Sequence, residues 1–341
     1  MNVAVEASLK SASTVFTVEV VISRFRENIL HCLELICKEG TFDEEIDVKV
    51  TIYNKGGDDC AEILQSAVDK KKGKFDRIVQ LLRDPNKFRI ISLDNLGREA
   101  HPYLFHVVHN YNDMASVTVF LPATCMNQVK EDHTVKLLQR VNTTRNTVIA
   151  GQWMAPSIRN RLGSFIISKW SGRDSDNAKL LTESNAVDCM PATRRPFSAW
   201  YDHFFPGIKT HVASYYSMLA VHRDLAWKKE VGHYKQLLDE LDVHSNPETG
   251  HFMERSWEAV FYPVPDACLF AARPIKQDNR RVTATGSGSA RATSDMSFAQ
   301  LMNSYGSGSK KRSAGAVDSE KDRGASADRH TSKKQTTHST D

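Results

Sequence analysis

The sequence contains no stretch that approaches the roughly 18 consecutive apolar residues of a membrane-spanning helix. The longest candidate, at positions 18–22, includes Glu19 and has the length of a strand. Near the N-terminus, Glu6 and Lys10 interrupt what would be the apolar region of a signal peptide. We therefore expect no membrane span and no signal peptide, which favours a cytoplasmic location.

Paired cysteines and the common nucleotide and hydrolase motifs are also missing. The six cysteines are scattered without a C-x-x-C pair, so we expect reduced, mostly buried thiols rather than a zinc site. There is no G-x-G-x-x-G after a strand, no G-x-x-x-x-G-K-S/T, no G-x-S-x-G and no H-E-x-x-H. Rossmann dinucleotide-binding, P-loop, serine-hydrolase and zincin functions therefore have no support.

The excess of basic residues is confined to the C-terminal part of the chain. The sequence holds 45 Lys and Arg against 41 Asp and Glu, a net charge of +4. Positions 280–341 contain 11 of the basic and 6 of the acidic residues, which leaves 34 basic and 35 acidic residues on positions 1–279. The nearly neutral body argues against nucleic-acid binding by the core.

Residues 276–341 form a Ser/Lys/Arg-rich tail with few large apolar side chains. Such a segment cannot bury enough surface to offset its chain entropy, so we expect it to be disordered. Its basic clusters at 310–312 and 333–334 are typical of a solvated linker, and a nuclear address is the alternative.

Strands and helices alternate along the rest of the chain. Runs rich in β-branched residues predict strands, and apolar residues at helical spacing predict the helices between them. The strands are expected at 15–23, 46–53, 88–93 and 116–121, and the helices at 26–38, 61–68, 75–82, 98–111, 224–241 and 250–261. Regular patterns also recur at 196–205 and 218–221. This order predicts one α/β domain over 16–275 with a mostly parallel, doubly wound sheet. We expect a flexible N-terminus at 1–15 and an irregular insertion at 142–192.

Ligands of such sheets bind at the carboxyl ends of strands, and polar motifs follow several of the predicted strands. Arg24 and Glu27 follow the first strand, where they could hold a phosphate or a nucleotide. The alternative is a solvated helix start, in which Glu27 is favourable near the positive end of the helix dipole. Asn54 and Lys55 close the second strand together with two glycines, a turn signal.

The segment DNLGREAHPY at positions 94–103 follows the third strand. A glycine permits a sharp turn, and the planar fork of Arg98 matches a diphosphate or a carboxylate bidentately. Glu99 and His101 adjoin this arginine. The structural alternative is that Asn95, or the aspartate before it, only caps the following helix.

A further candidate is NPETGHFMERSW at positions 246–257. A turn with Pro and Gly delivers Glu254 and Arg255 into the first turns of a helix. A carboxylate there could act as a general base if burial or neighbours tune its pKa. The alternative is a Glu–Arg pair that serves only architecture.

Taken in order, these motifs resemble the family called domain of unknown function 3431. The resemblance rests on VVISRFREN, VTIYNKGG, NLGREAHPYLFHVVHNY, VTVFLPA, RPFSAWYDHFF, HYKQLLDEL and NPETGHFMERSWEAVF, and covers about residues 17–263. The arrangement is also similar to glycosyltransferases of the GT-A type. Residues 95–99 are similar to the Asn-x-Gly-Arg-Asp motif of rhamnan-synthesis glycosyltransferases.

The resemblance implies a nucleotide-sugar transferase. Arg24, Glu27, Asn54 and Lys55 would line the nucleotide pocket, Asn95, Arg98 and Glu99 would face the sugar diphosphate, and Glu254 would be the base on the acceptor side. We count Arg98, Glu99 and Glu254 as the expected catalytic residues, and add the adjacent His101 and Arg255 to the substrate-binding ones.

One departure from the GT-A pattern concerns the metal. These enzymes usually carry Asp-x-Asp after the fourth strand, where it holds a divalent cation such as Mn²⁺ or Mg²⁺ on the diphosphate. Here the fourth strand runs into Pro-Ala-Thr-Cys at 122–125, and no carboxylate follows until Glu131. The expectation is that Arg98 and neighbouring basic groups replace some or all of the metal's charge.

Two other functions stay open. A non-catalytic module that keeps the fold and binds a glycan or a protein would account for the missing acidic pair. A phosphate-handling or hydrolytic enzyme would use His101 and Glu99.

Overall fold

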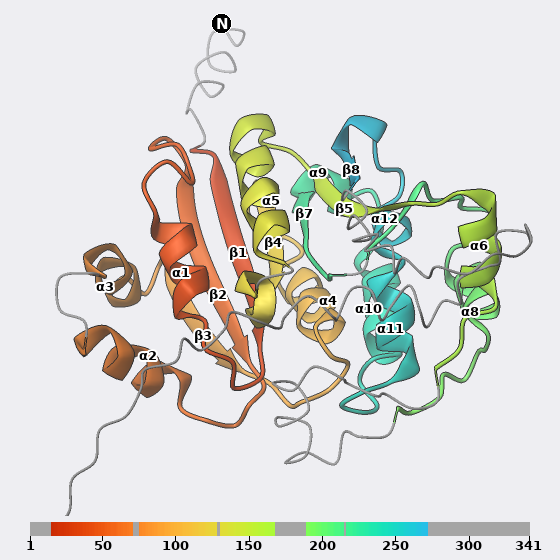
Figure 1. Ribbon diagram of the computed structural model, residues 1–341, viewed down its shortest axis with the longest axis horizontal. Coiled ribbons are helices and arrows are strands. Elements are labelled where there is room, and N and C mark those ends of the chain that lie inside the picture. The colour runs from red at the N-terminus through yellow and green to blue at the C-terminus, as the bar shows by residue number, and fades with distance from the viewer. Residues whose placement is uncertain (1–14, 71–74, 128–129, 168–188, 215, 272–341) are drawn as a thin grey trace, which may run out of the picture. The chain divides into compact units, whose positions relative to one another are not determined.

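The computed structural model describes residues 15–70, 75–127, 130–167, 189–214 and 216–271 (Figure 1). The tail expected at 276–341 and nearly all of the N-terminal segment expected at 1–15 lie outside the described residues. No described helix is both long enough and apolar enough to cross a membrane.

Eight strands form one sheet. They are β1 (Thr17–Arg24), β2 (Asp47–Asn54), β3 (Phe88–Ser92), β4 (Val117–Pro122), β5 (Val148–Trp153), β6 (Val212–Ala213), β7 (Leu219–His222) and β8 (Leu269–Ala271). Their order is β3-β2-β1-β4-β7-β5-β6, with β8 paired to β5. Strands β1 to β4 are parallel, whereas β7 runs antiparallel to both of its neighbours, β4 and β5. A mixed α/β fold with a mostly parallel sheet is thereby confirmed.

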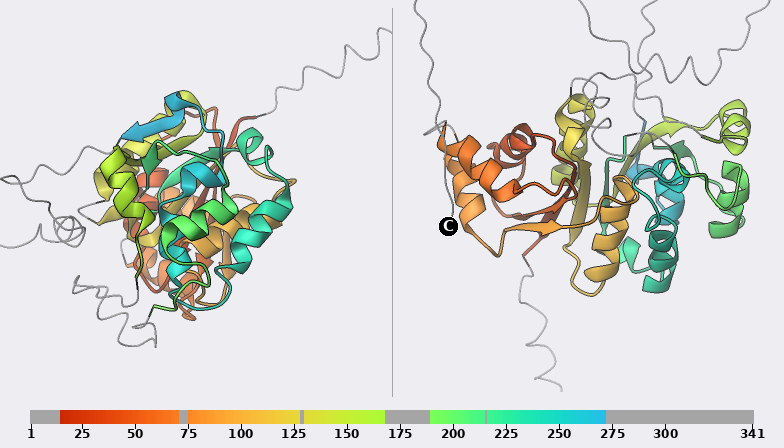
Figure 2. Two further views of the ribbon diagram at one scale, coloured as in Figure 1. Left: turned by 90° about the vertical axis from the view of Figure 1, so that its right-hand side faces the viewer. Right: turned by 90° about the horizontal axis from the view of Figure 1, so that it is seen from below.

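Helices cover both faces of this sheet. They are α1 (Leu30–Cys37), α2 (Cys60–Asp69), α3 (Asp76–Arg83), α4 (Ala100–His109), η1 (Ala123–Met126), α5 (Glu131–Thr144), α6 (Pro156–Gly163), α8 (Phe197–Phe204), α9 (Arg223–Ala226), α10 (Val231–Asp239), α11 (Glu248–Glu254), α12 (Trp257–Val260) and η2 (Asp266–Cys268). Helices α1 and α5 lie on one face, and α4, α10 and α11 lie on the other (Figures 1 and 2).

The period of two along each strand divides the core between the two faces. Val20 and Ile22 of β1 pack in the same cluster as Leu33 of α1. Val21, which points to the opposite face, packs in the cluster that contains Leu104 of α4. Because both faces are covered, the central strands are apolar along most of their length, as is typical of parallel sheets.

Of the irregular insertion expected at 142–192, residues 168–188 lie outside the described residues, whereas residues 142–167 contain regular elements. They include β5, which belongs to the sheet, and α6. The pattern is hard to read from sequence because Gly151 and Gln152 interrupt the strand, and Leu162 is the buried residue of α6. The predicted helix at 250–261 is broken after α11, where the Ser256 hydroxyl donates to the carbonyl of Phe252 at 2.9 Å.

All six cysteines lie within the described residues and are free thiols, five of them buried. One pair joins α1 to η1, with 3.3 Å between the Sγ atoms of Cys32 and Cys125. The expectation of reduced, mostly buried thiols agrees with this placement.

Candidate functional site

The polar motifs predicted at separate strand ends meet at one edge of the sheet. Parallel pairing places Arg24 opposite Asn54, and Asn54 opposite Ser92. The loops that leave β1, β2 and β3 therefore start side by side. In a sheet of order 3-2-1-4 the switch point lies between β1 and β4, and ligands bind there.

Arg24 fastens the first loop to the second. Its Nη1 donates to Asn54 Oδ1 and Asp58 Oδ1, both at 2.6 Å, and its Nη2 donates to Asp58 Oδ2 at 2.8 Å. The Nε donates to the carbonyl of Glu27 at 2.9 Å, and the side chain is 2% exposed. Hydrogen bonds from this guanidinium lower the pKa of Asp58 to about 2. Arg24 and Asn54 thus hold the loops in position.

Lys55 joins the second loop to the third. Its buried Nζ donates to the carbonyl oxygens of Leu96 at 2.5 Å and Arg98 at 2.7 Å. Burial lowers the pKa of Lys55 to about 7, although the nearby Glu99 carboxylate favours the charged form. A buried amine with so displaced a pKa is typical of functional sites.

We expect Lys55 to make stability rise with pH. Its folded pKa lies below the ordinary value of 10.5, so the unfolded chain binds more protons between about pH 7 and pH 10.5. In that window the free energy of unfolding of the wild type should increase relative to Lys55→Met, by up to about 1.4 kcal/mol per pH unit. Urea unfolding of both proteins at pH 6, 7.5 and 9 measures the difference. A difference that stays constant or falls with pH would contradict the assignment.

Arg98 connects the β3 loop to α11. Its Nη1 donates to Asn246 Oδ1 at 3.3 Å and lies 3.5 Å from His251 Nε2, while its Nε lies 3.5 Å from Glu99 Oε2. Gly250 leaves room for it, because a Cβ there would lie 3.3 Å from Arg98 Cδ. The two segments that the sequence analysis singled out therefore interlock.

Two arginines in these loops adopt left-handed backbone conformations. Arg26 has φ of 66° and Arg98 has φ of 55°. Arg26 is held by a hydrogen bond from its Nε to the carbonyl of Gly56 at 2.8 Å. Non-glycine residues in this region cost roughly 1–3 kcal/mol each and concentrate at functional sites.

Glu99 and Glu254 form an acid pair whose pKa values are shifted in opposite directions. Their side chains are 27% and 19% exposed, so both are mostly buried. Burial raises the pKa of Glu254 against the opposing charges of Arg255 and Arg98. Burial acts on Glu99 too, but the charges of Arg98 and Lys130 hold the pKa of Glu99 below its ordinary value. Such divergence separates the roles of two acids at one site.

Glu27 is a third carboxyl group at this edge. Its Oε2 accepts from the backbone N–H of Phe25 at 2.5 Å, and burial, with a smaller contribution from Glu99, raises its pKa. We call Glu27, Arg98, Glu99, Lys130 and Glu254 the acid–base cluster.

The remaining predicted residues are engaged at its border. His101 Nε2 lies 3.4 Å from Asp242 Oδ1, which joins α4 to the end of α10. Arg255 is buried, and its Nη1 donates to the carbonyl of His251 at 2.6 Å and to Glu254 Oε2 at 3.3 Å. Asn95 is half-buried in the β3 loop.

Lys130 was missed by the sequence analysis. It precedes α5 in the loop that follows β4, and its Nζ donates to Thr124 Oγ1 at 2.8 Å. Its position after the fourth strand was the available signal, since that loop reaches the same edge of the sheet as the other three. Lys130 is the first charged residue after β4.

The carboxylates that could hold a divalent metal lie against arginines. Within the described parts of the chain, no group of three or more His, Cys, Asp or Glu side chains could hold a metal ion. Glu99 lies against Arg98, and Glu254 lies against Arg255. An Mn²⁺ or Mg²⁺ ion would have to compete with these arginines for the carboxylates.

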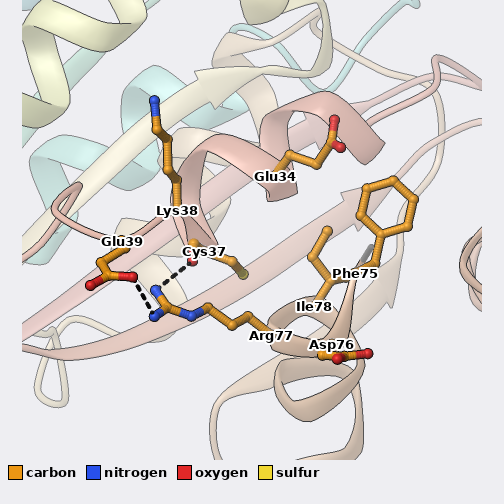
Figure 3. Close-up of a pocket in the computed structure, with 8 residues that line it drawn as sticks. All are labelled: Glu34, Cys37, Lys38, Glu39, Phe75, Asp76, Arg77 and Ile78. Atoms are coloured by element: carbon orange, nitrogen blue, oxygen red, sulfur yellow. Dashed lines mark hydrogen bonds and ion pairs between the residues drawn. The ribbon is translucent and has the colours of Figure 1, made fainter. Parts of the chain in front are cut away.

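A separate hollow lies between α1 and α3, with a volume of about 470 Å³ (Figure 3). Arg77 reaches across its mouth to Glu39 Oε2 at 3.1 Å, and the two side chains are 57% and 88% exposed. It contains none of the predicted site residues. Its exposed ion pair contributes little to stability. Because the hollow contains none of the predicted residues, the acid–base cluster remains the candidate site.

The chain belongs to a family of proteins of unknown function. The family model described as "Protein of unknown function (DUF3431)" matches residues 68–275, more than half of the chain. The match includes the β3 loop and α11, whereas Arg24, Glu27, Asn54 and Lys55 precede it. A search of the curated proteins found no match.

Proposed function

We propose that the protein is a glycosyltransferase-like enzyme of the GT-A type, which transfers a sugar from a nucleotide-sugar donor to an acceptor hydroxyl. The observation that carries this proposal is the mostly buried acid pair, Glu99 and Glu254, beside Arg98 at the switch-point edge of the sheet. Doubly wound sheets bind nucleotides at this place. The similarity of residues 95–99 to a glycosyltransferase motif favours a sugar donor over other nucleotides.

In the proposed reaction, an acceptor hydroxyl oxygen forms a bond to the anomeric carbon as the bond from that carbon to the diphosphate breaks. The hydroxyl proton passes to Glu254, and the bonding electron pair leaves with the diphosphate. A raised pKa makes Glu254 the better proton acceptor of the two acids. The Arg98 guanidinium would stabilise the charge that develops on the leaving oxygen.

Glu99 and Arg24 have supporting roles in this scheme. Glu99 stays ionised and orients Arg98 through its 3.5 Å contact with Nε. Arg24 holds the first two loops in register through Asn54 and Asp58. Neither residue exchanges a proton.

The test is Glu254→Gln, which keeps the shape of the side chain and removes the base. We expect donor binding to persist while turnover falls by roughly 10²–10⁴-fold, the usual contribution of a positioned general base. Thermal shift against a panel of nucleotide-sugars identifies the donor, and release of nucleoside diphosphate measures turnover.

Glu240→Gln is the matched control. Glu240 is 18% exposed and lies 3.4 Å from Arg194, much as Glu254 is 19% exposed and lies 3.3 Å from Arg255. Turnover should be unchanged in this variant. Donor binding without any turnover in the wild type would instead favour a binding module, and no binding by any nucleotide-sugar would refute the proposal.

A further inference from the structure

We infer that Lys130 and Arg98 form a diphosphate subsite that binds its anion without a divalent metal. The inference rests on the proposed function for its ligand class, and it names the side chains that take the place of a metal at the end of β4. It concerns a residue, Lys130, that the motifs of the sequence did not indicate.

The position of Lys130 is set from two sides. Its backbone N–H donates to the Asn127 carbonyl at 2.9 Å and to Asn127 Oδ1 at 3.1 Å. Its Nζ is directed to Thr124 Oγ1 at 2.8 Å, within the η1 turn that leaves β4. The ammonium is therefore held at the switch-point edge, where a glycosyltransferase of the GT-A type usually places its acidic pair.

The charge of Lys130 acts on the acid–base cluster. It lowers the pKa of Glu99 and opposes the rise in the pKa of Glu254, so its field reaches both carboxyl groups. Arg98 acts on the same two groups from the loop after β3. Arg98, in the loop after β3, and Lys130, in the loop after β4, thus lie close enough to act on the same carboxyl groups. Two cations at one edge of the sheet can bind a multiply charged anion together.

Charge also bears on the binding of an anion. The cationic side chains at the site are Arg98, Lys130 and Arg255, and the carboxyl groups are Glu27, Glu99 and Glu254. Burial raises the pKa of Glu27, and a proton on Glu27 leaves the site with more positive than negative side chains.

The test uses inorganic pyrophosphate as the probe and isothermal titration calorimetry on the full chain. We expect binding in EDTA that weakens as salt increases and that does not require Mg²⁺ or Mn²⁺. Lys130→Met should weaken it by roughly tenfold or more, the usual effect of losing a charge-assisted hydrogen bond. Lys130→Arg should restore most of the binding.

Lys136→Met is the matched control. Lys136 lies on α5, pairs with Asp132 on the helix surface and is 43% exposed. Its loss should leave pyrophosphate binding unchanged. Comparing Lys130→Met with Lys130→Arg also separates a loss of charge from a folding defect, since both variants alter the hydrogen bond to Thr124.

Binding that appears only with Mg²⁺ or Mn²⁺, binding equal in Lys130→Met and Lys136→Met, or no binding by the wild type would overturn the inference. Pyrophosphate binding without turnover of any nucleotide-sugar would leave the subsite standing and refute the enzyme. Sugar transfer that depends strictly on a divalent metal would support the enzyme and refute the metal-free subsite.

Discussion

Gly97→Ala is expected to lower the free energy of unfolding by about 2–5 kcal/mol. Gly97 has φ of 59°, a conformation that costs an L-residue roughly 1–2 kcal/mol. An added Cβ would also lie 2.6 Å from His101 Cβ and 2.7 Å from Leu241 Cβ. The backbone cannot easily retreat, because the Gly97 N–H donates to the carbonyl of His244 at 2.9 Å. Overpacking of this kind adds roughly 1–3 kcal/mol.

Gly57→Ala separates the two contributions. Gly57 has a similar φ of 69°, but a Cβ there would meet nothing within 4 Å. Gly57→Ala should therefore lower the free energy of unfolding only by the conformational cost of roughly 1–2 kcal/mol. Urea unfolding of both variants measures the comparison, and equal losses would show that close packing around Gly97 contributes nothing. Because Arg98 follows Gly97, the alanine variant should also weaken pyrophosphate binding.

Glu248→Ala should cost a similar amount, about 2–5 kcal/mol, by a different mechanism. The Glu248 side chain is fully buried, and its carboxylate accepts from the backbone N–H groups of Ile167 at 2.6 Å and Ala192 at 2.8 Å. Arg195 Nε lies 2.8 Å from the same carboxylate. Removal leaves two donors without their acceptor and one arginine without its counter-ion.

Glu240→Ala is the control for the loss of stability expected in Glu248→Ala. Glu240 pairs with the neighbouring Arg194 at 3.4 Å, but that arginine is 40% exposed. Partly solvated pairs contribute about 0–1 kcal/mol, so this variant should unfold within about 1 kcal/mol of the wild type. Thermal and urea denaturation report both changes. A loss at Glu240 as large as that at Glu248 would mean that burial of the carboxylate is not the cause.

Strands β1 and β4 could be predicted because they are buried on both faces. Their runs of β-branched residues are therefore continuous, and Val18 to Ile22 reads as a strand without any tertiary information. Strand β5 could not be predicted in this way. It is short, ends in Gly151, Gln152 and an exposed Trp153, and is defined by pairing with β7, about 70 positions later.

The convergence of the polar loops could be predicted from the sequence, whereas the contacts of their residues could not. Motifs that follow parallel strands must converge, which brought the β1, β2 and β3 loops together. The side chain that pairs with Arg24, however, is that of Asp58, which lies beyond the motif in the loop between β2 and α2. Lys130 likewise depends on the η1 turn, which no periodicity in the sequence indicates.

The antiparallel strand between β4 and β5 also affects how the chain is made. Strands β1 to β4 can pair as they leave the ribosome, but β5 has no hydrogen bonds to β4 and must await β7. At a synthesis rate of roughly 5–20 residues per second, those 70 positions take roughly 4–14 s. During that interval both β4 and β5 present open edges, which are templates for pairing with other chains. We therefore expect nascent chains that end between β5 and β7 to be prone to pairing with other chains.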